Sequence, residues 1–128
     1  MILVERLFPD AGNLKTEVWI SDSVLETIAE EAPEPFLAKL NYAARYGFWA
    51  LEGKRNALIR PEWDEVYRFG MHANLFRVYG FYEAANKRSF IAVDAFTKKG
   101  QRLRSAERDR ITEVGRVKRE NDWRKREE

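Results

Sequence analysis

The segment LFRVYGFYEAANKRSFIAVDAFT, residues 75–97, contains two runs of aromatic and β-branched residues on either side of a short polar turn. Leu75–Glu83 and Ser89–Thr97 are rich in the residue types that favour strands, and Asn86–Arg88 is typical of a hairpin loop. Strands joined by so short a connection pair antiparallel. A shorter run, Val66–Phe69, comes before them. The middle of the chain is therefore predicted to be a three-strand antiparallel meander.

Two helices are predicted upstream of this meander. Ser21-Asp22-Ser23 is expected to open the first helix, and Ser23 and Glu26 have the three-residue spacing of a capping box. Pro33 and Pro35 end it, because proline lacks an amide hydrogen and clashes with the preceding turn. Apolar residues at intervals of three and four then predict a second helix that ends near Gly47.

The remaining segments complete an α+β pattern. Residues 14–20 are a plausible strand, and residues 1–8 are either another strand or an irregular arm. Residues 48–63 show no clear period, and a turn is expected at Gly53–Asn56. Ser105 is expected to cap a last helix that reaches about Trp123. The predicted fold is an antiparallel sheet with an N-terminal helix pair and a C-terminal helix, the helices covering one face.

The composition excludes several classes of protein. The 128 residues suit a single domain spanning 1–128, and a hydrophobic content of 45% argues against disorder of the whole chain. The chain has no cysteine and one histidine, which excludes a disulfide framework, a thiolate metal site and a multi-histidine zinc site. No metal or other cofactor is expected. Without an apolar run of membrane-spanning length or a signal peptide, a cytoplasmic protein without a membrane partner is expected.

Charge is distributed unevenly along the chain. Residues 1–97 contain 11 Lys and Arg against 14 Asp and Glu, whereas residues 98–128 contain 12 against 7. The C-terminal quarter therefore has a net charge of +5 in a protein whose total is +2. Such a segment can dock a polyanion, although a helix that simply carries solvated salt bridges has the same composition.

Three short motifs in the meander resemble the RelE/HigB superfamily of toxin–antitoxin toxins, in particular its phage-derived branch. They are Tyr67-Arg68-Phe69, Leu75-Phe76-Arg77-Val78-Tyr79 and Phe96-Thr97-Lys98-Lys99. The superfamily usually shows an arginine on one strand, a second arginine between an aromatic residue and valine on the next, and a Phe-x-Lys-Lys at the end of the third. A basic helix follows in the family and here.

This resemblance implies a RelE-like fold and a toxin that cleaves mRNA on the ribosome without a metal ion. It also implies a protein antitoxin as partner, in a hetero-oligomer, with a homo-oligomer as a further possibility. Arg68, Arg77, Lys98 and Lys99 are the candidate catalytic residues. Cations suit this chemistry because arginine binds a phosphate through two parallel bonds, and a lysine crowded by other cations can lose its proton and act as a base. Alternating strand geometry predicts that at most one of Lys98 and Lys99 faces the site, unless the strand has ended before them.

Other candidate residues complete this hypothesis. His72 has a side chain suited to acid–base work, although a lone histidine is more often a bystander. The candidate RNA-binding residues are Arg102, Arg104, Lys118, Arg119 and Trp123. Trp123 could stack on a base or anchor the last helix against the sheet.

Two alternatives remain open. Many members of the superfamily have a catalytic tyrosine or histidine near the C-terminus, whereas Trp123 is the only aromatic residue in that part of this chain. The chain could therefore be a non-catalytic binding protein of the superfamily, such as a gyrase inhibitor or an inactive phage-derived remnant held by a partner. It could also be an interaction module whose aromatic residues lie under a partner.

Overall fold

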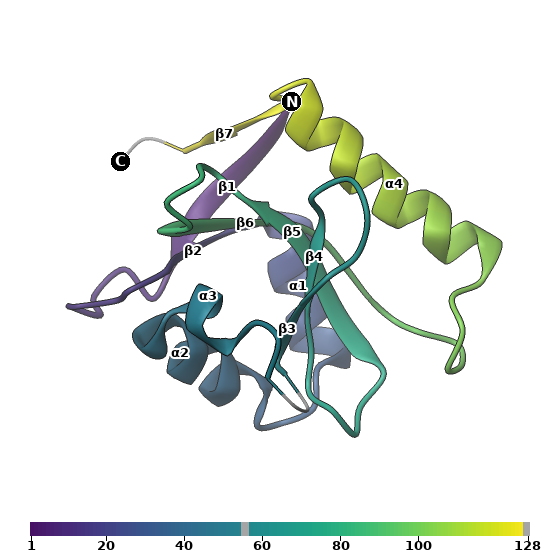
Figure 1. The fold of residues 1–128 in the computed structure, drawn as a ribbon, viewed down its shortest axis with the longest axis horizontal. Helices are drawn as coiled ribbons and strands as arrows, with labels where there is room; N and C mark the ends of the chain where they lie inside the picture. Colours follow the sequence, from purple (N-terminus) through teal and green to yellow (C-terminus); the bar gives the residue numbers. More distant parts are fainter. Residues whose placement is uncertain (55–56, 127–128) are drawn as a thin grey trace.

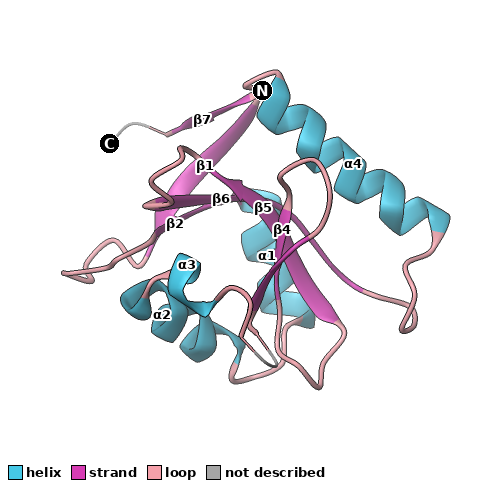
Figure 2. Cartoon of the chain, viewed as in Figure 1, coloured by secondary structure: helices cyan, strands magenta, loops and turns pink. Residues whose placement is uncertain are grey.

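The structure is a computed structural model that describes residues 1–54 and 57–126, so the turn expected at Gly53–Asn56 lies partly outside the described residues. Its strands are β1 (Ile2–Leu7), β2 (Glu17–Ser21), β3 (Ile59–Pro61), β4 (Tyr67–Phe69), β5 (Phe76–Tyr82), β6 (Ser89–Thr97) and β7 (Trp123–Lys125). Its helices are α1 (Asp22–Glu31), α2 (Phe36–Tyr46), α3 (Phe48–Leu51) and α4 (Ser105–Arg119). The described strands form one sheet in the order β3-β4-β5-β6-β2-β1-β7 (Figures 1 and 2).

The predicted meander is confirmed. β4 pairs antiparallel with β5, and β5 pairs antiparallel with β6. β6 has the bounds that the sequence predicts, and β4 and β5 are shorter by one or two residues. The predicted N-terminal helix pair and C-terminal helix are present as α1, α2 and α4.

The prediction of an antiparallel sheet is wrong, because the sheet is mixed. β2 runs parallel to β6, and β7 runs parallel to β1. The chain leaves β2 through three helices and three strands before β6 returns beside it, and so long a connection allows a parallel neighbour. Residues 1–8 are not an irregular arm: β1 joins the sheet antiparallel to β2, and its Val4 is fully buried.

The helices cover both faces of the sheet, which corrects the prediction that they share one face. Val24, Ile28 and Leu40 from α1 and α2 belong to one core cluster. Ile111 and Val114 from α4 belong to a second cluster on the other face. α4, yellow in Figure 1, accordingly lies across the strands from α2. All seven residues of β5 are buried, so both faces of this strand need a cover.

The first helix begins within the predicted Ser21–Ser23 segment, and the N-cap of α4 is one residue earlier than predicted. Ser21, rather than Ser23, is the N-cap of α1, and its Oγ accepts a hydrogen bond from the Val24 amide at 3.2 Å. Arg104, rather than Ser105, precedes α4, and the Glu107 carboxylate accepts its amide at 2.8 Å. These acceptors satisfy amide groups that have no partner inside a helix.

Three short elements lie where no regular structure was predicted. α3 and β3 lie within residues 48–63, which lack a clear period. β7 begins at Trp123, where the last helix was expected to end, because α4 stops at Arg119. In the part of the chain that the structure describes, no helix has the length and apolarity needed to span a bilayer.

Candidate functional site

Arg68 and Arg77 lie on the α4 side of the sheet. Arg68 in β4 is directly opposite Tyr79 in β5, and Tyr79 is part of the core cluster beneath α4. Side chains at directly opposed positions point to the same face, so Arg68 shares the face of Tyr79. Arg77 precedes Tyr79 by two residues on one strand and therefore points to this face as well.

Lys98 joins the two arginines just past the end of β6. Its amide donates to the Leu75 carbonyl at 2.9 Å, and its Nζ donates to the Gln101 carbonyl at 2.9 Å. Burial lowers the pKa of Lys98, and the positive charges of Arg77 and then Arg68 lower it further. Lys98 thus lies within electrostatic reach of both arginines.

Lys99 does not join this group. Its side chain is exposed, and only its backbone amide is held, by the Glu107 carboxylate at 3.0 Å. β6 ends at Thr97, so both lysines lie beyond the strand and the alternation of strand side chains does not apply to them.

The Glu62 carboxylate lies among the cations. The Glu62 Oε1 lies 2.9 Å from the Arg68 Nε, and the two side chains are 16% and 26% exposed, so solvent reaches both. Burial raises the pKa of Glu62, and the opposing effects of Arg68, Lys98 and Arg77 do not fully offset it. Arg60 in β3 is directly opposite Arg68 and adds a further positive charge on this face. We refer to these residues as the Arg68 cluster: Arg60, Glu62, Arg68, Arg77 and Lys98.

Arg77 anchors a turn. Its side chain is 7% exposed, and its Nη1 donates to the carbonyl oxygens of Met71, Asn74 and Phe76. Burial lowers the pKa of Arg77, with a further lowering from Arg68. The space around it is tight, since a Cβ placed on Gly70 would lie 2.5 Å from the Arg77 Cδ. Arg77 therefore shapes the site by holding the turn between β4 and β5.

Replacing Arg77 with methionine tests this anchoring role. Methionine keeps an unbranched apolar stem but leaves the carbonyl oxygens of Met71, Asn74 and Phe76 without their donor. We expect the free energy of unfolding to fall by about 2–3 kcal/mol, because partly buried acceptors lose a charged donor. Urea denaturation followed by circular dichroism measures this change. An unchanged midpoint would contradict the anchoring role and leave Arg77 as a purely electrostatic member of the cluster.

His72 lies on the turn that Arg77 holds. Its side chain is exposed, and among the described residues it makes no side-chain hydrogen bond. The turn closes with the Asn74 amide donating to the Met71 carbonyl at 3.1 Å. His72 therefore occupies an exposed position on this turn, and its predicted catalytic role stays a prediction.

Tyr79 contributes a buried hydroxyl beneath the charges. The side chain is fully buried, and its hydroxyl oxygen has no hydrogen-bond partner among the described residues. Burial raises the pKa of Tyr79, and the negative charge of Glu62 raises it further. The hydroxyl therefore keeps its proton at neutral pH. A buried polar atom without a partner is uncommon in folded proteins.

The predicted RNA-binding residues divide into two groups. Arg102 and Arg104 are exposed and lie between Lys98 and the start of α4, beside the Arg68 cluster. Lys118 and Arg119 lie at the other end of α4, roughly 20 Å away for a helix of this length. There they face acidic residues of the β3–β4 loop, with Lys118 Nζ 3.4 Å from Glu65 and Arg119 Nη1 3.4 Å from Asp64.

Trp123 lies in β7 rather than on the helix. Its ring packs edge-on against Phe81, with the ring centroids 5.8 Å apart. It is part of the packing around the core cluster beneath α4 and is only partly exposed. Of the two roles considered for Trp123, this contact agrees with an anchor against the sheet.

Sequence reasoning missed three members of this region. Arg60 and Glu62 both lie in residues 48–63, for which the sequence shows no clear period. Tyr79 follows Arg77 by two residues on one strand, so the sequence could have placed both side chains on one face. Nothing in the sequence shows that the Tyr79 hydroxyl lies near Glu62. The pairing of β3 with β4 brings Arg60 and Glu62 to Arg68.

Among the described residues, no group of three or more His, Asp or Glu side chains is arranged to hold a metal ion. The groups gathered at the Arg68 cluster are four cations, a carboxylate with a raised pKa, and the buried Tyr79 hydroxyl beneath them. No protein-family model matches the chain, and neither a curated protein nor a solved structure matches it.

Proposed function

We propose that this protein is a toxin of the RelE/HigB type, a metal-independent endoribonuclease that cleaves mRNA on the ribosome and so inhibits translation. The observation that carries the proposal is the Arg68 cluster, in which four basic side chains surround one carboxylate of raised pKa. The resemblance of the β4, β5 and β6 motifs to those toxins supports the same function.

The proposed reaction uses the 2′-hydroxyl of the RNA as nucleophile. Glu62 accepts the proton of this hydroxyl as its oxygen forms a bond to phosphorus. Arg68 and Arg60 stabilise the added negative charge on the phosphoryl oxygens, since a guanidinium presents paired donors to a phosphate. Lys98 donates a proton to the 5′-oxygen as its bond to phosphorus breaks. The products are a 2′,3′-cyclic phosphate and a 5′-hydroxyl, and solvent restores the two protonation states.

The surroundings of the cluster support contact with RNA. Arg102 and Arg104 extend the positive surface beyond Lys98, where they would bind phosphates of mRNA or ribosomal RNA, and this binding should weaken as salt rises. Lys118 and Arg119, which face acidic side chains, would contribute less. A protein antitoxin that covers the Arg68 cluster would switch the enzyme off.

Mapping of mRNA 5′ ends tests the proposal. A reconstituted translation system is given the protein, a defined mRNA and either complete ribosomes or none, and the message is then analysed by primer extension. New ends inside the reading frame that require ribosomes support the proposal. An intact message with continued protein synthesis would contradict it, and an intact message with arrested growth in cells would direct attention to a non-catalytic target such as gyrase.

The pH dependence of cleavage is expected to be bell-shaped. Because burial raises the pKa of Glu62, the acid limb should lie above the ordinary carboxyl range. Because burial and nearby cations lower the pKa of Lys98, the basic limb should lie below the ordinary lysine range. Arg68 lowers both pKa values, so Arg68→Ala should move both limbs to higher pH.

Two measurements check these pH effects. Initial cleavage rates from pH 5 to 10 give the two limbs, and a carbon-13 NMR titration of the Glu62 carboxyl gives its pKa without relying on activity. Glu62→Gln should remove the acid limb. A Glu62 pKa that falls after Arg68→Ala would contradict the proposed coupling.

A further inference from the structure

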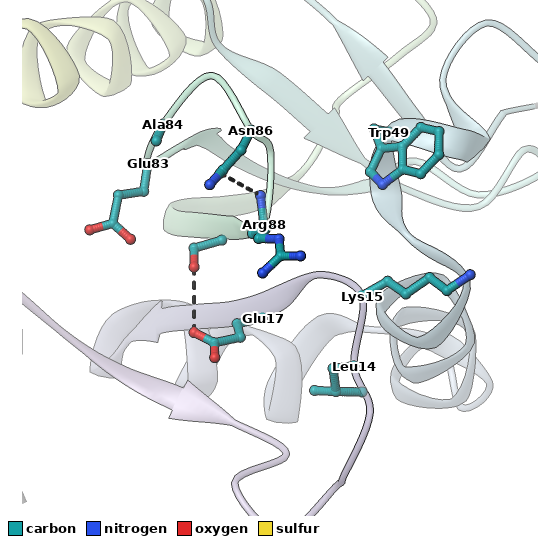
Figure 3. Close-up of a pocket in the computed structure, with 9 residues that line it drawn as sticks. Leu14, Lys15, Glu17, Trp49, Glu83, Ala84, Asn86 and Arg88 are labelled. Carbon is teal, nitrogen blue, oxygen red and sulfur yellow. Dashed lines mark hydrogen bonds between the residues drawn. The ribbon is translucent and has the colours of Figure 1, made fainter.

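A pocket lies at the other end of the sheet from the Arg68 cluster. It has a volume of about 800 Å³, within the range of small-molecule sites, and the residues around it include Lys15, Trp49, Glu83 and Arg88. Figure 3 shows these side chains around the loop between β5 and β6. Glu83, just past the end of β5, follows Arg77 by six positions along the strand direction, so the pocket is roughly 20 Å from the cluster.

Buried contacts set the positions of Lys15 and Trp49. The amides of Lys15 and Thr16 both donate to the Ala44 carbonyl at 3.0 Å, and the Phe48 amide donates to the buried Thr16 Oγ1 at 2.9 Å. Gly47 has a φ of 105°, which lets the chain reverse between α2 and α3. As a result, the Trp49 indole and the Lys15 stem both lie within 3.5 Å of the point where a Cβ on Gly47 would stand.

Arg88 is brought to the same pocket from another strand. Its carbonyl accepts the Glu17 amide at 2.7 Å, which joins the start of β6 to the start of β2. In Figure 3 the Arg88 guanidinium lies between the Trp49 and Lys15 side of the pocket and the side that carries Glu17 and Glu83. Three separate segments therefore bring two cations and an indole ring together.

The two carboxylates that line the pocket, Glu17 and Glu83, form ion pairs with residues other than Lys15 and Arg88. Glu17 is engaged by Arg6 at 3.5 Å, and Glu83 by Lys125 at 2.8 Å. Lys15 and Arg88 are exposed, and neither makes an ion pair with any residue that the structure describes. Trp49 is 54% exposed, although it is large and apolar. An exposed indole beside two cations of this kind is suited to an anionic ligand with a flat ring.

We propose that this pocket binds a nucleotide of single-stranded RNA, with the base stacked on Trp49 and the flanking phosphates held by Arg88 and Lys15. Aromatic rings stack on any base, and cations in a groove hold the backbone, so the site would recognise single strands with little sequence preference. The pocket is separate from the Arg68 cluster. RNA binding in this pocket is a function beyond the proposed cleavage and does not depend on that cleavage.

Fluorescence anisotropy with a labelled single-stranded RNA of about ten nucleotides tests the proposal. The measurements use the Lys98→Ala variant as the parent, so that the RNA stays intact and failure of cleavage does not affect the result. Trp49→Leu should weaken binding about tenfold, because base stacking is lost. Arg88→Gln should lower the slope of log affinity against log salt by about 0.7, the value for one phosphate contact on a single strand.

Matched controls come from the same side of the protein. Tyr42 is 52% exposed and Lys39 is exposed, both on α2 and neither in the pocket. Tyr42→Leu and Lys39→Gln should leave the affinity unchanged, and melting temperatures should confirm that all variants fold. An RNA without bases should bind the parent about tenfold more weakly than intact RNA binds it. The Trp49→Leu variant should bind the two RNAs with equal affinity.

Two results would overturn the proposal. One is an affinity of Trp49→Leu and Arg88→Gln that equals the affinity of the parent. The other is an oligoglutamate peptide of matched charge that binds as tightly as the RNA, which would show an anionic protein segment, rather than a nucleotide, as the occupant. Loss of cleavage in the ribosome assay together with intact pocket binding would reject the proposed function alone.

Discussion

Gly80→Ala is expected to lower the free energy of unfolding by about 3 kcal/mol or more, a large part of the total stability of a small domain. A Cβ at this position would lie 2.1 Å from the Ile91 carbonyl oxygen and 2.9 Å from the Ala92 Cα. These are backbone atoms of the neighbouring strand and cannot rotate away. β5 is buried along its whole length, so it has no free direction in which to move.

The close approach at Gly80 coincides with a β-bulge. Tyr79 pairs with Asp94 and Gly80 pairs with Ala92, so Val93 is the extra residue of β6. A bulge of this kind redirects the side chains that follow it. Gly80→Ala should therefore disturb the direction of β6 towards Lys98 as well as the stability of the fold.

Guanidinium denaturation followed by tryptophan fluorescence measures this loss, with Gly12→Ala as the matched control. A Cβ on Gly12 would meet nothing within 4 Å, and its φ is not in the left-handed region. The control should change the free energy of unfolding by no more than about 0.5 kcal/mol. Equal midpoints for Gly80→Ala and Gly12→Ala would mean that β5 and β6 do not approach as closely as described.

Lys98→Ala is expected to lower the rate of mRNA cleavage by at least about 100-fold, because the leaving oxygen loses its proton donor. Arg68→Ala should cause a loss of similar size, because the phosphoryl charge loses its main partner. Single-turnover cleavage of mRNA in stalled ribosome complexes measures both, since it separates the chemical step from product release.

Lys99→Ala is the matched control for Lys98→Ala. It removes the same charge from the neighbouring residue, but the Lys99 side chain is exposed and lies apart from the cluster. The cleavage rate of Lys99→Ala should stay within about threefold of the rate of the unmodified protein, since one surface charge contributes modestly to RNA binding. Equal losses for the two lysine variants would show that net charge, rather than the arrangement of the Arg68 cluster, supports activity.

The candidate site was partly predictable from local patterns. The alternation of β5 places Arg77 and Tyr79 on one face. Lys98 and Lys99 both lie beyond the end of β6 at Thr97, where alternation no longer applies. Glu62 and Arg60 could not be found in this way, because their proximity to Arg68 depends on β3, a strand of three residues. Arg77 was predicted to be catalytic, whereas its hydrogen bonds to three carbonyls within the six preceding residues hold a turn, a role that no sequence pattern indicated.

The sequence by itself determined the elements whose signals are local: the meander of β4, β5 and β6, the helix pair ended by prolines, and the basic C-terminal helix. The tertiary structure decided which strands became neighbours over long distances, including β2 beside β6 and β1 beside β7. It also decided that both sheet faces are covered and that Trp49 lies beside Lys15. The physical reason is that periodicity and turn residues act over a few positions, whereas strand pairing and burial depend on the free energy of the whole chain.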